Sequence, residues 1–272
     1  MDKVDLHLHT TASDGTETPR DVVKKAAESN IRAIAITDHD SVSGIDEALK
    51  EGKKHNIEVV PGVEISSYCN DQEIHFLGYY PQIDNFRFLK NLQKMRDDRF
   101  SRMQKMIKKL KAIGININFS EVCQEAKESA LGRPHLARVL IKKGYVKDFT
   151  EAFTKFLGKG KPAYVQRKKL SPAKAITLIL KAGGVPVLAH PGLYKNDSLI
   201  RQFIKDGLRG IEVFHPIHSR WETIRYKLIA RYYNLLITGG SDYHGKGEQF
   251  STIGEPPVSY RNLQLLKKEI KK

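Results

Sequence analysis

The sequence has few cysteines and no long hydrophobic run. Cys69 and Cys123 are the only cysteines among 272 residues, too few for a disulfide framework and not spaced like a zinc-binding pair. No apolar stretch approaches the roughly 18 residues of a membrane span, and the first residues lack the charged-then-apolar layout of a signal peptide. These absences exclude a disulfide scaffold and predict a cytoplasmic chain with reduced thiols.

Acidic residues are scarce relative to basic ones. The chain has 31 Asp and Glu against 46 Lys and Arg, which gives a net charge of +15. An excess of this size attracts polyanions, so nucleic acids, nucleotides and anionic membranes are candidate partners. A net charge of +15 is equally compatible with a basic protein that has no such partner. The position of the charge along the chain has to distinguish these two possibilities.

Short β-branched runs alternate with amphipathic segments and give seven strand candidates. Helix-start signals such as Thr18-Pro19 and Ser171-Pro172 separate the runs, and the 40% hydrophobic content can fill a core. This alternation predicts an α/β fold with parallel strands and helical crossovers. We expect a barrel-like β/α ring rather than an open sheet, which the same pattern also permits. The candidates are residues 4–8, 33–37, 58–64, 74–80, 185–189, 210–214 and 236–239.

One region interrupts the alternation. Residues 84–169 contain no convincing strand, and their longest helical pattern repeats apolar residues at a spacing of three to four between Leu89 and Ile113. Ten Lys or Arg and two acids lie between Arg87 and Lys111. A solvated polar face explains much of this charge, and contact with an anionic substrate is the alternative. We predict a barrel domain, 1–83 with 170–272, and a helical insertion or cap, 84–169.

Histidines and acidic residues gather at the predicted strand ends. Taken singly, each has an ordinary explanation: Asp38-His39 can cap a helix, His190-Pro191 can form a turn, and Glu64 can be an exposed strand end. However, the carboxyl ends of barrel strands share one rim, where buried imidazoles and carboxylates cost free energy unless they are paired or bind metal. Only His75 lies within its strand. The set predicts a polynuclear metal site made of His7, His9, Asp14, His39, Glu64, His75, His190, Asp242 and His244.

The donor types indicate the metal and its chemistry. Imidazole and carboxylate without thiolate suit Mn²⁺, Fe²⁺ or Zn²⁺, and nine ligands are enough for two or three such ions, with Glu64 as a bridge. Ions about 4 Å apart can bind a phosphoryl group and lower the pKa of a bridging water. This predicts phosphoester hydrolysis by metal-bound hydroxide.

Two further residues receive predicted catalytic roles. Asp38, beside His39, can orient a metal ligand from behind. Either His215 or His218 can protonate the leaving group or contact phosphate. An ordinary hydrogen-bonded histidine is equally compatible with both positions.

Ordered motifs along nearly the whole chain carry a family resemblance. They are HLH at 7–9, SDG at 13–15, TDHD at 37–40, PGVEI at 61–65, IHFLGY at 74–79, HPG at 190–192 and GSDYHG at 240–245. In this order they resemble the polymerase-and-histidinol-phosphatase (PHP) family. The resemblance implies a distorted seven-stranded β/α barrel with up to three divalent ions. No ligand position of the pattern is replaced, which argues against a metal-free scaffold of the kind found in some polymerase PHP domains.

The insertion narrows the resemblance. Segments 132–140 (GRPHLARVL), 158–166 (GKGKPAYVQ) and 182–192 (AGGVPVLAHPG) are similar to the branch that contains bacterial 3′,5′-nucleoside bisphosphate phosphatases and 5′-to-3′ exoribonucleases. This implies a phosphorylated nucleotide or short RNA as substrate, with no membrane partner and no obligate protein partner. The resemblance implies that Arg133 and His135 bind a phosphate. Lys159, Lys161 and Tyr164 can add contacts to the substrate, and His218 is a further candidate for contact with phosphate.

The same insertion residues have structural explanations. Arg133 can simply precede a helix that starts at Pro134, and Tyr164 can be a core residue instead of a platform for a base.

Three functions of different classes fit these observations. The first is a metal-dependent phosphoesterase acting on nucleotides or RNA ends, which uses both the ligand set and the basic insertion. The second is a phosphatase of a small metabolite such as histidinol phosphate, which needs the same metals but leaves the basic helix without a role. The third is a nucleic-acid-binding accessory module without chemistry, for which the ligand set is surplus.

Overall fold

A computed structural model describes residues 2–70, 72–126, 131–166, 170–245 and 252–270. The chain divides into two compact units, Met1–Leu89 with Lys169–Lys272, and Lys90–Lys168. Residue 169, where the predicted insertion ends, lies outside the described residues. Among the helices of the described residues, none is both long enough and apolar enough to cross a membrane.

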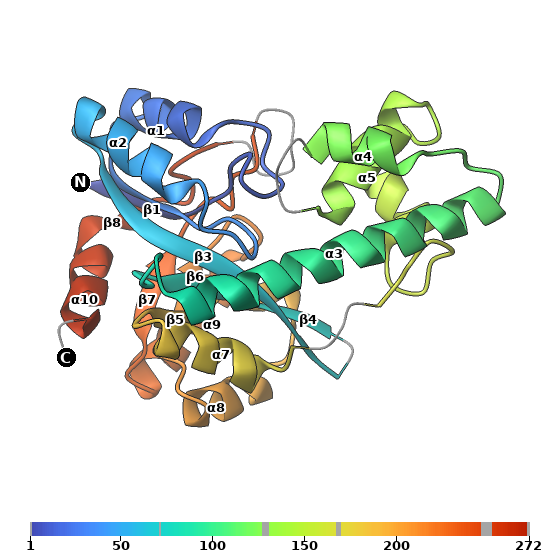
Figure 1. The fold of residues 1–272 in the computed structure, drawn as a ribbon. Helices are drawn as coiled ribbons and strands as arrows, with labels where there is room; N and C mark the ends of the chain where they lie inside the picture. The colour runs from blue at the N-terminus through green and yellow to red at the C-terminus, as the bar shows by residue number, and fades with distance from the viewer. Residues whose placement is uncertain (1, 71, 127–130, 167–169, 246–251, 271–272) are drawn as a thin grey trace. The chain divides into compact units, whose positions relative to one another are not determined.

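The first unit is built on one curved sheet (Figure 1). Its strands follow the order β7-β6-β5-β4-β3-β2-β1-β8. A bridge between Leu8 and Tyr243, in which the His9 N–H donates to the Tyr243 carbonyl at 2.9 Å, joins the end of β1 to the chain after β7. The sheet is therefore nearly closed, which confirms the barrel-like prediction. The strands are β1 (Lys3–Leu8), β2 (Ile31–Ile36), β3 (Glu58–Cys69), β4 (Gln72–Tyr79), β5 (Val185–Leu188), β6 (Gly210–Phe214), β7 (Leu236–Gly239) and β8 (Val258–Ser259).

Two details of the predicted sheet are wrong. An eighth strand, β8, pairs antiparallel with β1; at two residues it is too short to show a sequence period. In addition, β4 runs antiparallel to both β3 and β5, although all strands were expected to be parallel. Cys69 of β3 pairs with Gln72 of β4, so the link between these strands is far shorter than the dozen residues that a parallel crossover needs.

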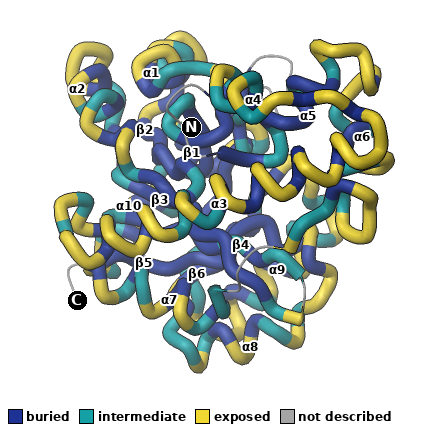
Figure 2. Tube along the Cα trace, turned by 45° about the vertical axis from the view of Figure 1, so that its right-hand side comes forward, coloured by how far each residue is buried: buried dark blue, intermediate teal, exposed yellow. Residues whose placement is uncertain are grey.

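The helices of the first unit pack against this sheet, and Leu263 and Leu266 of the last helix join a core cluster with residues of β1 to β5. The helices are α1 (Pro19–Glu28), α2 (Ile45–His55), α7 (Pro172–Lys181), η2 (Pro191–Leu193), α8 (Ser198–Lys205), α9 (Arg220–Tyr232) and α10 (Tyr260–Ile270). As the sequence predicts, Thr18 and Ser171 cap α1 and α7, each accepting a hydrogen bond from a first-turn backbone N–H. The strands are buried and the outer sides of the helices are exposed (Figure 2).

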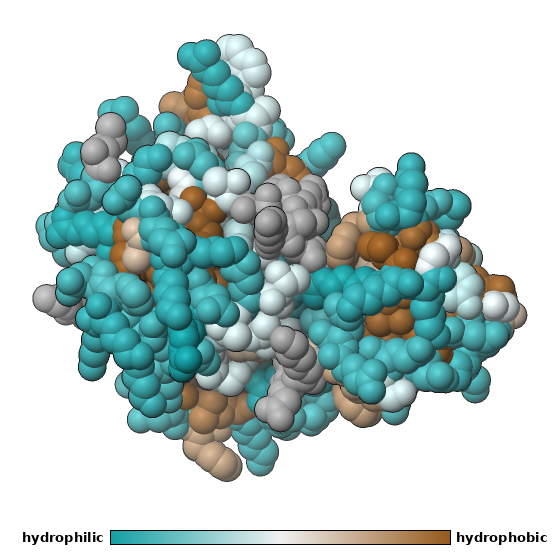
Figure 3. Space-filling view, turned by 90° about the horizontal axis from the view of Figure 1, so that it is seen from above, coloured by the Kyte–Doolittle hydropathy of each residue, from teal (hydrophilic) through white to brown (hydrophobic). Residues whose placement is uncertain are grey.

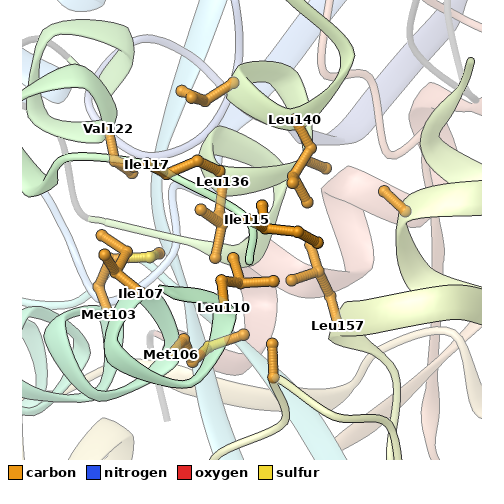
Figure 4. Packing of buried hydrophobic residues seen from close by; sticks show 14 of the residues in the cluster. Met103, Met106, Ile107, Leu110, Ile115, Ile117, Val122, Leu136, Leu140 and Leu157 are labelled. Atoms are coloured by element: carbon orange, nitrogen blue, oxygen red, sulfur yellow. The ribbon is translucent and has the colours of Figure 1, made fainter. Parts of the chain in front are cut away.

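The second unit is helical in its described residues. It contains α3 (Phe86–Ala112) from Lys90 onward, α4 (Phe119–Ala126), α5 (Arg133–Lys142), α6 (Phe149–Ala152) and η1 (Phe153–Leu157). Met103, Met106 and Leu110 of α3 point into a core with Leu136 and Leu140 of α5 (Figure 4). Leu89 and Ile113, at the ends of the same predicted stripe, are exposed instead.

Hydrophilic residues cover most of the face of the molecule drawn in Figure 3, as expected for a strongly charged chain.

Candidate metal centre

The structure brings all nine predicted metal ligands together at one end of the barrel. They come from β1 and the loop after it, from the chain after β2, from β3 and β4, and from the turns after β5 and β7. Neighbouring imidazole rings lie close together. The centroid of the His9 ring is 4.1 Å from that of His244 and 4.7 Å from that of His39. The centroid of the His75 ring is 5.1 Å from those of His39 and His190. Residues separated by more than 200 positions therefore line one site.

The reversed direction of β4 explains how His75 reaches this site. His75 lies near the start of β4, and because β4 is antiparallel, its start lies at the edge where the parallel strands end. Glu64, in turn, is not a strand end as the sequence predicts but the seventh of twelve residues in β3. Its side chain nevertheless faces His75, since both strands continue past the rim as a hairpin.

His7, His9, Glu64 and Asp242 form the first donor group. His7 Nε2 and His9 Nε2 are 3.1 Å apart, and they lie 3.3 Å and 3.2 Å from Asp242 Oδ1. Glu64 Oε2 is 3.6 Å from His7 Nε2 and 3.3 Å from His9 Nε2. Ligands placed 2.1 Å from one ion lie about 3.0 to 3.4 Å from each other in octahedral or tetrahedral geometry. Four of the observed spacings, 3.1 to 3.3 Å, fit a shared cation, and the distance of 3.6 Å between His7 and Glu64 is slightly longer.

Glu64 occupies the middle of the cluster. Its side chain is 1% exposed, and its Oε1 lies 2.9 Å from both His75 Nδ1 and His190 Nε2. Its other oxygen, Oε2, lies 2.9 Å from His39 Nδ1. Because the two oxygens face different imidazoles, this carboxylate can serve two cations at once.

A further donor group lies on the outer side of His9. His244 Nε2 is 3.4 Å from Asp14 Oδ1, and His39 Nε2 is 3.9 Å from Asp14 Oδ2. Four overlapping sets of three or four donor atoms, each set within 4.8 Å, occur in the described part of the chain: His9, Asp14, His39 and His244; His7, His215 and Asp242; His7, His9 and Glu64; His39, Glu64 and His75. The cluster can hold metal.

The electrostatics of the cluster keep its carboxylates ionised. Burial alone would raise the pKa of Glu64, but the imidazoles of His39, His75 and His7 hold it well below its usual range. Asp242 follows the same pattern, with its pKa held well below normal by His7 and other imidazoles against the effect of burial. Burial lowers the pKa of His190 to about 4, so its ring is neutral near pH 7. Burial would also lower the pKa of His75 and His244, but neighbouring carboxylates raise these values to about 9 and about 10, so both rings are protonated near pH 7 without metal. Because ionised carboxylates and neutral imidazoles are the forms that bind metal, binding would release protons from these two rings.

Two buried residues behind the ligands were missed by the sequence analysis. Glu212, in β6, places Oε1 3.0 Å from His7 Nδ1, and its Oε2 accepts a hydrogen bond from the His190 backbone N–H at 2.7 Å. The Tyr194 hydroxyl accepts from the His75 backbone N–H at 2.8 Å and lies 3.0 Å from His190 Nδ1. Such contacts fix which ring nitrogen faces the metal. The signal for Glu212 was an acid inside the otherwise apolar strand GIEVF.

Close approach of the backbone also shapes the rim. Gly240, which follows β7, lies so close to β1 that a Cβ there would come within 2.4 Å of His7 N, so only glycine fits. His190 and Asp242 have positive φ angles of 28° and 53°. Non-glycine residues in this region are strained, and such strain concentrates at functional sites.

The residues predicted to be catalytic occupy different positions around the centre. Asp38 accepts hydrogen bonds from Thr10 N and Thr10 Oγ1, both at 2.8 Å, and from Ser13 Oγ. It thereby fixes the loop that carries Asp14. His215 Nε2 is 3.3 Å from Asp242 Oδ2, inside the donor cluster.

His218 lies beside the donor cluster, with its ring centroid 5.5 Å from that of His215. His218 Nε2 accepts from the Gly192 N–H at 3.1 Å, next to His190. In the second unit, His135 is buried and its Nδ1 accepts from the Gly132 N–H at 3.0 Å, so it caps α5. Arg133, the first residue of α5, lies over the Phe153 ring. Lys161 is exposed and Tyr164 is half-buried.

Comparison with known proteins agrees with this geometry. Residues 5–155 match the model of the PHP domain. The chain is 34% identical over 268 residues to a 3′,5′-nucleoside bisphosphate phosphatase from Chromobacterium violaceum, covering 95% of this chain and 94% of that protein. It is 33% identical to the 5′-3′ exoribonuclease Rnm of Escherichia coli, covering 88% and 84%. A crystal structure from Bifidobacterium adolescentis, described as a candidate metal-dependent phosphoesterase, superposes with a TM-score of 0.91 at 31% identity over 97% and 95% of the two chains.

Proposed function

The chain belongs to the PHP family, and on this basis we propose that it is a metal-dependent phosphoesterase that hydrolyses phosphate esters of nucleotides and of the 5′ ends of short RNA. The observation that carries the proposal is the convergence of nine metal donors around Glu64. The relatives named above are a nucleotide phosphatase and an exoribonuclease, and the alignments cover most of each chain.

In this proposal the cluster binds two or three ions of Mn²⁺, Fe²⁺ or Zn²⁺. His7, His9 and Asp242 would hold one ion, His75 and His190 a second, and Asp14, His39 and His244 a third, with Glu64 shared between groups. Bound divalent ions would supply Lewis acidity toward a phosphoryl oxygen and an activated water. The donor set is imidazole and carboxylate throughout, as these metals prefer.

The protein's own residues complete the site in this proposal. Glu212 and Tyr194 hold the ligand rings in place, and Asp38 holds the loop that carries Asp14. His215 is buried beside Asp242, where it is available either as a further donor or to transfer a proton to the leaving oxygen.

We propose that the basic residues of the chain determine which substrate binds. The net charge of +15 and the ten cations between Arg87 and Lys111 favour a polyanionic substrate over a small metabolite with one phosphate. Arg133 and Lys161 are the proposed contacts to a phosphate that does not react, with His135, Tyr164 and His218 as supporting residues.

A direct comparison of substrates tests this proposal. The purified protein is treated with a chelator, Mn²⁺ is added back, and phosphate release is measured from adenosine 3′,5′-bisphosphate, from a 5′-phosphorylated oligoribonucleotide and from histidinol phosphate. Mononucleotide release from the oligoribonucleotide is measured as well, because cleavage of its first phosphodiester bond releases a nucleotide and no inorganic phosphate. We expect turnover of the first two substrates and little of the third, and none before Mn²⁺ is added. Preferential turnover of histidinol phosphate would instead establish a metabolite phosphatase. Failure to hydrolyse any of the three would leave a binding module without chemistry.

A further inference from the structure

Helix α9 carries a stripe of large apolar side chains that face solvent. Trp221, the only tryptophan of the chain, is 80% exposed, and Tyr232 is 81% exposed. Ile224 and Leu228 lie between them and are also exposed. The spacing of three to four residues places all four side chains along one face of the helix. Large apolar residues on one helix face normally pack into a core, so this face has another use.

A groove runs beside the stripe. Its volume is about 550 Å³, within the range of roughly 300 to 1,000 Å³ in which small organic ligands bind. An ion pair between Arg225 and Asp197 forms part of its wall. The lining residues are Asp197, Trp221, Ile224, Arg225, Leu228, Ile229 and Tyr233.

Cations are interleaved with these rings. Helix α9 contains four exposed basic residues, and its single acid, Glu222, is occupied in capping the helix with Ser219. Single-stranded nucleic acids bind to surfaces of this composition, because bases stack on aromatic rings while cations attract the phosphates. The basic residues are Arg220, Arg225, Lys227 and Arg231; because Arg225 is paired with Asp197, the charge that would attract phosphates comes from the other three.

A second copy of the chain fits the same face less well. In a two-fold contact between two α9 helices, the cations of one helix would lie against the cations of the other. Each chain also carries a net charge of +15. Like charges in an interface oppose binding, so the charge that complements α9 is that of a polyanion.

The stripe begins next to the metal centre and belongs to the same compact unit. Strand β6 ends at Phe214, His215 lies 3.3 Å from Asp242, and α9 starts at Arg220. Trp221 therefore stands in the first turn of the helix, near the rim. From Trp221 to Tyr232 the stripe extends roughly 17 Å along α9.

We infer that this face of α9 binds single-stranded RNA, holding nucleotides that follow the one whose 5′ phosphate lies at the metal centre. The inference rests on the proposed function, since RNA must be a substrate for such a site to serve catalysis. A nucleoside bisphosphate has a single base, which would lie at the metal centre. The α9 face would therefore bind longer RNA and not nucleoside bisphosphates.

Fluorescence tests binding directly, because the emission of the chain's single tryptophan comes from this face. The chelated, metal-free protein is titrated with a 5′-phosphorylated decaadenylate and, separately, with adenosine 3′,5′-bisphosphate. We expect the decanucleotide to quench the emission of Trp221 and the bisphosphate to leave it unchanged. Binding of a labelled decanucleotide, seen by anisotropy, without any change in emission would overturn the inference. This readout needs no hydrolysis, so it stands or falls separately from the proposed function.

Kinetics of a double variant test the role of the face. We expect W221A/Y232A to raise the KM for the decanucleotide at least about fivefold, the loss of one stacked base, while its kcat and the KM for the bisphosphate stay within about twofold of the wild type. L265A, which removes an exposed side chain from α10, is the matched control. Equal effects on both substrates, or none on the decanucleotide, would refute the inference. A wild-type dimer that the double variant converts to a monomer would assign the face to a second copy.

Discussion

Replacing Glu212 by Gln tests the inner architecture of the centre more sharply than removing a ligand. Both oxygens of Glu212 face groups that donate: His7 Nδ1 at 3.0 Å and the His190 backbone N–H at 2.7 Å. A glutamine offers one acceptor oxygen and one NH₂ group. Whichever way it turns, the NH₂ group is placed against one of the two donors.

The consequence depends on which contact the glutamine keeps. If its oxygen stays on the backbone N–H, its NH₂ faces His7 Nδ1, and His7 then carries its proton on Nε2, the nitrogen that faces Asp242 and Glu64. A protonated Nε2 cannot bind metal. If the glutamine turns over, a buried backbone N–H is left without an acceptor, which costs about 1 to 3 kcal/mol.

We expect Glu212→Gln to weaken metal binding about 10- to 100-fold, the usual effect of losing such a contact behind a ligand, or about 1.4 to 2.7 kcal/mol. Titration of the chelated protein with Mn²⁺ measures the affinity. Raising the Mn²⁺ concentration should restore most of the hydrolytic rate, because no group that contacts substrate has been removed. Glu51→Gln, at another buried carboxylate of the same unit, is the control.

Wild-type Mn²⁺ affinity in a folded Glu212→Gln protein would refute this reasoning. Loss of rate that excess Mn²⁺ does not restore, with affinity unchanged, would refute it as well, because Glu212 would then act on the reaction and not on the ligands.

Three more outcomes are expected. Glu64→Gln should abolish bound metal and activity together, as measured by elemental analysis and phosphate release, because the bridge loses its charge; full metal content at the wild-type rate would contradict the bridging role. In the chelated protein, burial would lower the pKa of His75 and His244, but neighbouring carboxylates raise these values to about 9 and about 10. The charged forms of these two histidines therefore stabilise the fold fully below about pH 6.5, and this stabilisation disappears as the pH rises through 9 to 10. The Tm of the chelated protein should fall between pH 7 and pH 10. A constant Tm over this range would argue against these pKa values. Arg133→Ala should raise the KM for nucleoside bisphosphates more than for monophosphates, and equal effects would assign Arg133 to its helix alone.

The local pattern of the sequence was sufficient for most of the elements and for the donor residues that the structure gathers at the rim. Alternating β-branched runs and cap residues such as Thr18 and Ser171 act over a few residues, so the seven longer strands and the helix starts could be read directly. The ligand types and their places after the strands follow from the same reading, and they indicated the metal chemistry before any geometry was known.

Only the tertiary structure decided how distant residues meet. The direction of β4 depends on which strands it pairs with, and that pairing brings His75 to the rim and places Glu64 inside a strand. Glu212 gave little signal, because its contacts lie in β1 and after β5, more than 20 residues away along the chain in each case. The exposed face of α9 is likewise a property of packing, since an apolar stripe in a sequence does not show whether a core covers it. Residue types and local spacing are therefore encoded along the chain, whereas partners and exposure arise only when the strands close around Glu64.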